Sequence, residues 1–132
     1  MINEGFFYDG GRIRQIPVNI GGSTYKPPLP IENIVVERIS DIINSALDDI
    51  DKAIELTLFV MKTQVFIDGN KRTAIIFANH YLISKGKGLL VVPYDLVPEF
   101  KKLLIAYYED RDNESIKEFL KDRVGEKFDE AD

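Results

Sequence analysis

The residues best suited to chemistry lie in one stretch, residues 64–72 (QVFIDGNKR), where a short loop enters a predicted helix. The N-terminus of a helix offers unpaired N–H groups and positive dipole, and Gly69 lets a ligand approach the backbone closely. Lys71 and Arg72 put two cations in the first turn, where the dipole disfavours them, so a bound anion explains them better than helix stability does. Asp68 suits Mg²⁺, which takes one or two carboxylates together with phosphate oxygens. The stretch predicts a phosphate site.

A second interpretation of the same loop needs no ligand. Asp-Gly-Asn is a common turn sequence, and Asp68 is explained equally well as a cap on the helix that follows. The residues of the loop do not by themselves decide between the two.

Helices must position this loop, and apolar residues recur at helical spacing in five segments, about 31–44, 48–63, 70–84, 95–107 and 113–120. Asp48, Asp95 and Asn113 stand where N-caps are expected. The helix over 70–84 is apolar nearly all round, which is typical of a buried central helix. One face carries Ala74, Ile75, Ala78, Tyr81 and Leu82, and the other carries Ile76, Phe77, His80 and Ile83.

Residues 5–30 are rich in glycine, proline and aromatic side chains. Within them Ile16, Val18 and Ile20 alternate with Pro17 and Asn19, which predicts a short edge strand in a β-hairpin flap, followed by an extended loop. We therefore expect an all-α fold with one small β-hairpin. A single domain over residues 1–124 comprises the flap and loop (5–30) and a helical core (31–124), and 125–132 form a charged tail.

Composition excludes several classes of function. The chain has 132 residues, no cysteine, one histidine and a formal net charge of −5. Disulfide, thiolate and Cys/His zinc chemistry are therefore ruled out. The basic residues are scattered among acids, which argues against a nucleic-acid partner. No run of 18 apolar residues predicts a membrane span, and the absence of cysteine fits a cytoplasmic protein.

The loop resembles the signature of the Fic (Fido) family, H-x-F-x-D/E-G-N-x-R-x-x-R, which it matches at Phe66, Asp68, Gly69, Asn70 and Arg72. Residues 12–28 are similar to the family's flap and following loop, and residues 107–120 are similar to its C-terminal helices. The resemblance covers about residues 11–124.

The resemblance implies a helical domain that transfers AMP, or another phosphate-bearing group, from ATP or a related nucleotide to a protein hydroxyl. Asp68 would hold Mg²⁺, and Gly69, Asn70 and Lys71 would form the anion site. Arg72 would pair with the β-phosphate.

Two further sets of residues take a role from the resemblance. The flap would bind a segment of a target protein as an added strand; its residues are Val18, Asn19, Ile20, Gly21 and Gly22. Tyr107 and Tyr108 are equally well explained as an adenine-binding wall or as core residues.

The departures from the signature bear directly on activity. Gln64 stands where the family has its general-base histidine, and a neutral amide has no useful proton affinity near pH 7. Ile75 replaces the second arginine. His80 is about 15 Å along the helix from Asn70 and is expected to be a hydrogen-bonded core residue. The family's inhibitory motif, S/T-x-x-x-E-G/N, has no match in the chain.

Three hypotheses follow for the function. The first is a nucleotide-binding domain whose transferase activity is lost or weakened, because Gln64 replaces the base. The second is an active nucleotidyl- or phosphoryl-transferase that modifies a protein hydroxyl by altered chemistry. The third is a peptide-binding interaction module that uses no nucleotide.

Overall fold

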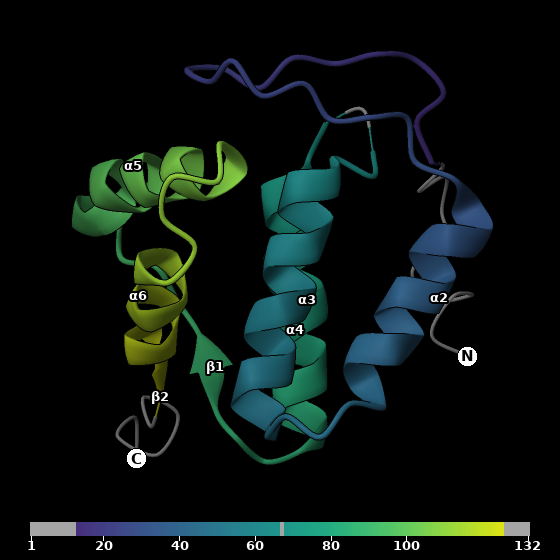
Figure 1. The fold of residues 1–132 in the computed structure, drawn as a ribbon. Helices are drawn as coiled ribbons and strands as arrows, with labels where there is room; N and C mark the ends of the chain where they lie inside the picture. The colour runs from purple at the N-terminus through teal and green to yellow at the C-terminus, as the bar shows by residue number, and fades with distance from the viewer. Residues whose placement is uncertain (1–12, 67, 126–132) are drawn as a thin grey trace.

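A computed structural model of the chain describes residues 13–66 and 68–125. Helices dominate it, and Figure 1 shows their arrangement: α2 (Glu32–Ile43), α3 (Asp49–Thr63), α4 (Asn70–Ser84), α5 (Val97–Tyr108) and α6 (Ser115–Arg123). A single 3₁₀ turn, η1 (Tyr94–Leu96), precedes α5. Strands β1 (Leu89–Leu90) and β2 (Val124–Gly125) pair antiparallel. The all-α fold with a small two-stranded sheet is confirmed, and each helix lies within three residues of its expected bounds.

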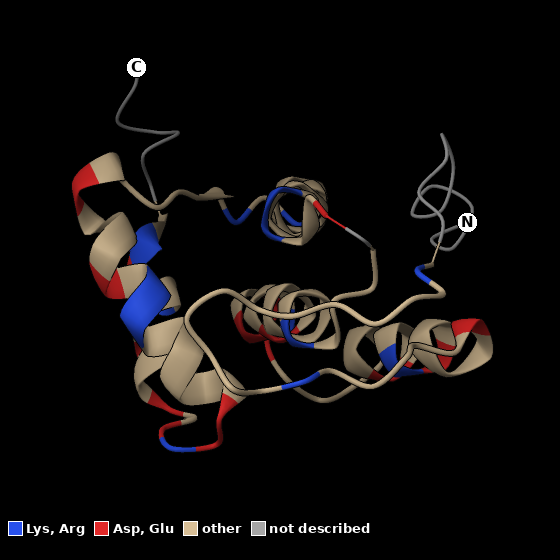
Figure 2. Cartoon of the chain, turned by 90° about the horizontal axis from the view of Figure 1, so that it is seen from above, with Lys and Arg blue, Asp and Glu red and all other residues tan. Residues whose placement is uncertain are grey.

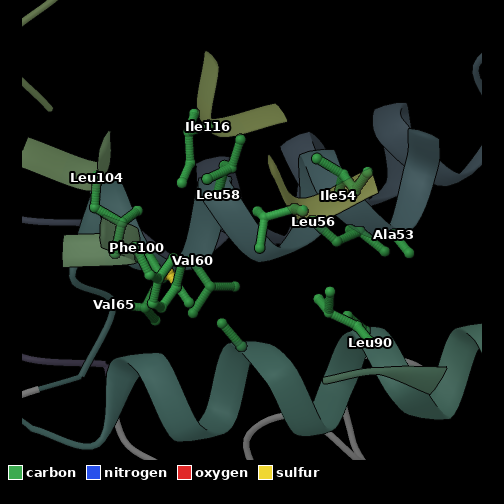
Figure 3. Packing of buried hydrophobic residues seen from close by; sticks show 14 of the residues in the cluster. Ala53, Ile54, Leu56, Leu58, Val60, Val65, Leu90, Phe100, Leu104 and Ile116 are labelled. Carbon is green, nitrogen blue, oxygen red and sulfur yellow. The ribbon is translucent and has the colours of Figure 1, made fainter. Parts of the chain in front are cut away.

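The centre of the domain is α3, which packs most extensively against α4 and also contacts α2 and α6. Its side chains from Ala53 to Met61 include seven buried residues. Figure 3 shows apolar side chains of α3 in one core with residues of the following elements: Ala53, Ile54, Leu56, Leu58 and Val60 with Leu90, Phe100, Leu104 and Ile116. The predicted cap is confirmed, because Asp48 Oδ1 accepts a hydrogen bond of 2.9 Å from the amide of Asp51.

The expectation that α4 is buried all round is wrong. Its buried residues are Asn70, Ala74, Ala78 and Leu82, which lie on the face toward α3. On the other face Ile76 is 57% exposed and Ile83 is 58% exposed. His80 lies on that face and is exposed as well, so it is not a core histidine. Helical periodicity shows which residues share a face, but not whether another element covers that face.

The predicted position of the β-hairpin is also wrong. Residues 13–30 form an extended segment with a turn at Gly21–Gly22, and none of them is paired as a strand; residues 5–12 lie outside the described part of the chain. Pro17 has no N–H to donate to a sheet. The carbonyls of Ile16 and Pro28 are already taken by the side chain of Arg14. The two strands of the structure instead come from the connections after α4 and α6.

Two of the predicted caps do not form. No side chain caps η1 or α5, so Asp95 does not act as an N-cap. Before α6 it is Asp112, rather than Asn113, whose Oδ1 accepts the amide of Ser115 at 3.0 Å. Among the described residues, no helix is long and apolar enough to cross a membrane.

Candidate functional site

The C-terminal end of α3 is held by one buried arginine. Arg14 is 2% exposed, and each hydrogen bond that its guanidinium donates to a described residue goes to a backbone carbonyl. The acceptors are Gln64 O, Thr63 O at 3.2 Å, Ile16 O at 3.0 Å, Pro27 O at 3.3 Å and Pro28 O at 2.8 Å. The carbonyls of Thr63 and Gln64 form the negative end of the α3 dipole, where a cation is favoured. Arg14 thus joins the extended N-terminal segment to the loop that follows α3.

Gln64 ends α3 with left-handed backbone geometry, at φ 50°. Its side chain turns back into the structure rather than outward. Nε2 donates to Met61 O at 2.5 Å, and Oε1 accepts from Asn70 Nδ2 at 3.2 Å. Both ends of the amide are therefore occupied by the protein, and neither has the proton affinity of a base at neutral pH.

Asn70 holds the loop between α3 and α4 in a closed turn. It is 5% exposed, and its Oδ1 accepts the Phe66 amide at 2.9 Å while Nδ2 donates to Phe66 O at 2.8 Å. Phe66 is 8% exposed and belongs to the hydrophobic core. The side chain of Asn70 is therefore taken up by the loop and by Gln64.

The N-terminus of α4 has no capping side chain and no acid in its first turn. Gly69 stands at the N-cap with φ 72°, a conformation that glycine adopts at little cost. The guanidinium of Arg72 folds over it, because a Cβ at Gly69 would lie 2.9 Å from Arg72 Nη2. Asp68 is exposed and forms no ion pair among the described residues. The start of α4 thus brings together the N–H groups of a helix N-terminus, a cation and a carboxylate that has no ion-pair partner in the described part of the chain.

A pocket of about 290 Å³ opens beside this point. One wall is the turn of Ile20, Gly21 and Gly22, and Lys71 comes from the first turn of α4. The opposite wall is one face of α5, with the spacing i, i+3, i+4 and i+7: Lys101, Leu104, Ile105 and Tyr108. The pocket therefore has an apolar, aromatic side and a cationic side. Its volume is near the lower end of the range for small-molecule sites, about 300–1,000 Å³.

The two lysines of the pocket are charged groups without acidic partners. Within residues 13–66 and 68–125, neither Lys71 nor Lys101 forms an ion pair. Burial lowers the pKa of Lys71, and the neighbouring charge of Lys101 lowers it further. Figure 2 looks down on this end of the bundle and shows basic residues at the start of α4 and along α5. Two like charges held together without a counter-ion favour an anionic ligand.

The two tyrosines at the end of α5 have different surroundings. Tyr108 is 2% exposed, lines the pocket, and stacks on Tyr25 with ring centroids 6.3 Å apart. Burial, with a smaller contribution from Tyr107, raises the pKa of the Tyr108 hydroxyl, which stays neutral. Tyr107 lies outside the pocket, and its ring is 5.0 Å from Lys62 Nζ. Only Tyr108 is placed to contact a ligand.

The structure thus brings together some of the predicted site residues and separates others. Lys71, Tyr108 and the turn at Ile20–Gly22 line one pocket, next to the start of α4. Val18 and Asn19 precede that turn and do not line the pocket.

Sequence analysis did not identify Arg14, Lys101 or Glu109, whose Oε2 accepts a hydrogen bond of 2.7 Å from Ser23 Oγ. Each acts on a partner distant in the chain. Lys101 could have been identified from its helical spacing to Tyr108, seven residues later on the same face of the predicted helix.

Comparison with models of known protein families matches residues 2–82 to one described as the Fic/DOC family. The match covers more than half of the chain and includes α3, the loop and most of α4. A search of curated proteins gives no match to this sequence.

Proposed function

Since the chain belongs to the Fic/DOC family, whose domains generally transfer AMP, we propose that it binds a nucleotide of the ATP type and that its transfer of AMP from that nucleotide to a protein hydroxyl is lost or weakened. The observation that carries the proposal is the pocket between the Ile20–Gly22 turn, Lys71 and α5, which opens beside the uncapped N-terminus of α4. A nucleotide combines an apolar ring with an anionic tail, and the pocket combines an aromatic wall with two free lysines.

The start of α4 supplies what phosphates require. Backbone N–H groups at a helix N-terminus bind anions directly, and Lys71 and Arg72 add charge where it is otherwise unfavourable. Asp68 fits the role of a Mg²⁺ ligand, because this ion is usually held by one or two carboxylates plus phosphate oxygens and water. The described residues contain no cluster of three potential metal-ligating side chains. A metal here would therefore depend on the phosphates for its remaining ligands.

The weak transfer follows from Gln64. A general base typically contributes about 10²–10⁴ in rate, and the amide of Gln64 cannot accept the proton of an attacking hydroxyl. Its two hydrogen bonds, to Met61 O and Asn70 Nδ2, also hold it in a structural role.

Mg-ATP is expected to stabilise the protein against heat. At about 100 times the dissociation constant it should add about 2.7 kcal/mol, which corresponds to several degrees in Tm for a domain of this size. Lys71→Ala should weaken binding by about 10–100-fold, the value of one charge-assisted hydrogen bond. Thermal melts with and without Mg-ATP measure both effects.

The control variant for this experiment is Lys87→Ala. Lys87 is also exposed, but it follows the C-terminal end of α4, away from the pocket. The Lys87→Ala variant loses one positive charge, as Lys71→Ala does, and should leave the rise in Tm caused by Mg-ATP unchanged. Equal loss of the shift in Lys71→Ala and Lys87→Ala would show only a general charge effect, and no shift in the wild type would contradict nucleotide binding.

Nucleotide affinity is also expected to depend on pH through Lys71. Its pKa is lowered in the free protein, and only its charged form attracts phosphate. Affinity should therefore be highest near neutral pH, where Lys71 is charged. It should fall as the pH rises through the lowered pKa of Lys71, which lies below the usual lysine value of about 10.4. Lys71→Arg keeps its charge throughout and should show a flatter profile. Titrations at increasing pH measure the difference; identical profiles would exclude Lys71 as the titrating group.

A further inference from the structure

Glu109, at the C-terminal end of α5, reaches across to the turn that forms one wall of the pocket. Its Oε2 accepts a hydrogen bond of 2.7 Å from Ser23 Oγ and one of 3.2 Å from the amide of Thr24. Its Oε1 accepts from Arg111 Nε at 2.9 Å. One carboxylate thus ties the residues just after the turn to the helix that forms the opposite wall.

The turn itself is compact and fits closely against α5. The amide of Ser23 donates to Ile20 O at 3.1 Å, and Gly22 has φ 84°. A Cβ at Gly22 would lie 3.1 Å from Ile105 Cδ1, so the glycine allows the backbone to approach the helix. Ser23 Oγ also accepts the amide of Tyr25 at 3.0 Å. The hydroxyl of Ser23 therefore connects Glu109 to the backbone of the segment.

Tyr25, which follows Thr24, makes a second contact with α5. The ring of Tyr25 stacks on Tyr108, and Lys62 Nζ lies 5.5 Å from the Tyr25 ring. Lys62 is itself paired with Asp110 at 3.3 Å. Residues 22–25 are therefore held against α5 by packing, by a carboxylate and by an aromatic stack in succession.

We infer that Glu109 is a positioning residue, which holds the Gly21–Gly22 turn against α5 and so maintains the nucleotide pocket. It touches no ligand itself. Without it, the contacts that remain between the turn and α5 among the described residues are those of Gly22 and Tyr25, and a smaller fraction of molecules has the pocket formed. The apparent dissociation constant rises as the inverse of that fraction. The effect on affinity rests on the proposed nucleotide binding, whereas the effect on the turn does not.

The charge of Glu109 supports this role. Hydrogen bonds from Ser23, Arg111 and Thr24 lower the pKa of its carboxyl, so it is ionised at neutral pH. An ionised carboxylate accepts stronger hydrogen bonds than a neutral group does. The amide of Glu109→Gln keeps one acceptor oxygen and should restore part of what Glu109→Ala loses.

The test compares Glu109→Ala, Glu109→Gln and Ser23→Ala in two measurements. In the free protein, amide hydrogen exchange at Ser23 and Thr24 should rise by about tenfold or more in Glu109→Ala, because local opening becomes easier. In titrations with Mg-ATP, the same variant should bind about 3–10-fold more weakly. Glu109→Gln should lie between it and the wild type. Glu118→Ala, which removes an exposed carboxylate from α6, is the matched control and should change neither measurement.

The outcomes separate the two proposals. Unchanged hydrogen exchange in Glu109→Ala would overturn the positioning role. If the wild type binds nucleotide, unchanged nucleotide affinity in Glu109→Ala would overturn it as well. If the wild type binds no nucleotide, the proposed function and the affinity effect both fail. Faster exchange of Ser23 and Thr24 would in that case still support the part of the inference that concerns the turn. Non-additive effects in the Ser23→Ala/Glu109→Ala double variant would show that the two side chains act through one contact.

Discussion

Replacing Gln64 with histidine is expected to raise AMP transfer by about 10²–10⁴-fold, the usual contribution of a general base. Position 64 has φ 50°, and histidine is among the residues that adopt positive φ more readily than most. An imidazole has a pKa near neutrality, so it can take the proton of an attacking hydroxyl. Incorporation of label from ATP labelled in the α-phosphate measures AMP transfer, and label in the γ-phosphate measures phosphoryl transfer.

Two variants control for structural effects at this position. Gln64→Ala also loses the contacts with Met61 and Asn70, but it supplies no base, so it should stay as inactive as the wild type. Gln64→His combined with Arg72→Ala should lose the gained activity, because Arg72 is expected to hold the phosphates. Wild-type transfer as fast as that of Gln64→His would favour altered chemistry that needs no histidine. No transfer by Gln64→His, despite bound ATP, would contradict the role given to Gln64.

The second large effect is expected at Arg14. Arg14→Ala removes the donor to five backbone carbonyls, one of them buried and the other four partly buried, and a buried group left unpaired costs about 1–3 kcal/mol. Relaxation and water entry reduce the sum, so we expect a loss of about 2–4 kcal/mol in the free energy of unfolding. The variant should also bind nucleotide more weakly, because the segment that Arg14 holds carries the Ile20–Gly22 turn. Urea unfolding measures the loss of stability.

The geometry of the guanidinium is tested by Arg14→Lys. Lysine keeps the positive charge at the end of α3, but its single ammonium group cannot replace the three guanidinium nitrogens that together reach five carbonyls. It should recover less than half of the lost stability. Lys26→Ala, an exposed change in the same segment, should alter stability by no more than about 0.5 kcal/mol. A loss that small in Arg14→Ala would show that the carbonyls find other donors.

The helices could be predicted from the sequence because their signals are local. Apolar residues repeat at helical spacing, Asp48 provides a cap, and Gly69 starts α4. Which face of α4 is buried could not be predicted in the same way. Its two apolar faces look alike in the sequence, and only the packing of α3 against Ala74 and Ala78 decides which one is buried.

The site could be predicted only in part, for a related reason. The loop from Gln64 to Arg72 is continuous in sequence, so its residue types and its resemblance to the Fic signature favour a phosphate site, which stays a prediction. The pocket beside it depends on contacts between distant segments, such as Ser23 with Glu109. The alternating residues of the flap predict a strand, but alternation by itself shows only an extended chain. The hydrogen bonds of Arg14 to Ile16 O and Pro28 O determine where that chain runs.

A crystal structure of the protein with bound Mg-ATP tests whether the pocket between the Ile20–Gly22 turn, Lys71 and α5 holds a nucleotide. We expect phosphates at the first N–H groups of α4, within hydrogen-bond distance of Lys71, and the nucleoside in the pocket near Tyr108. A pocket that stays empty at saturating Mg-ATP, or a nucleotide bound elsewhere on the protein, would contradict this expectation.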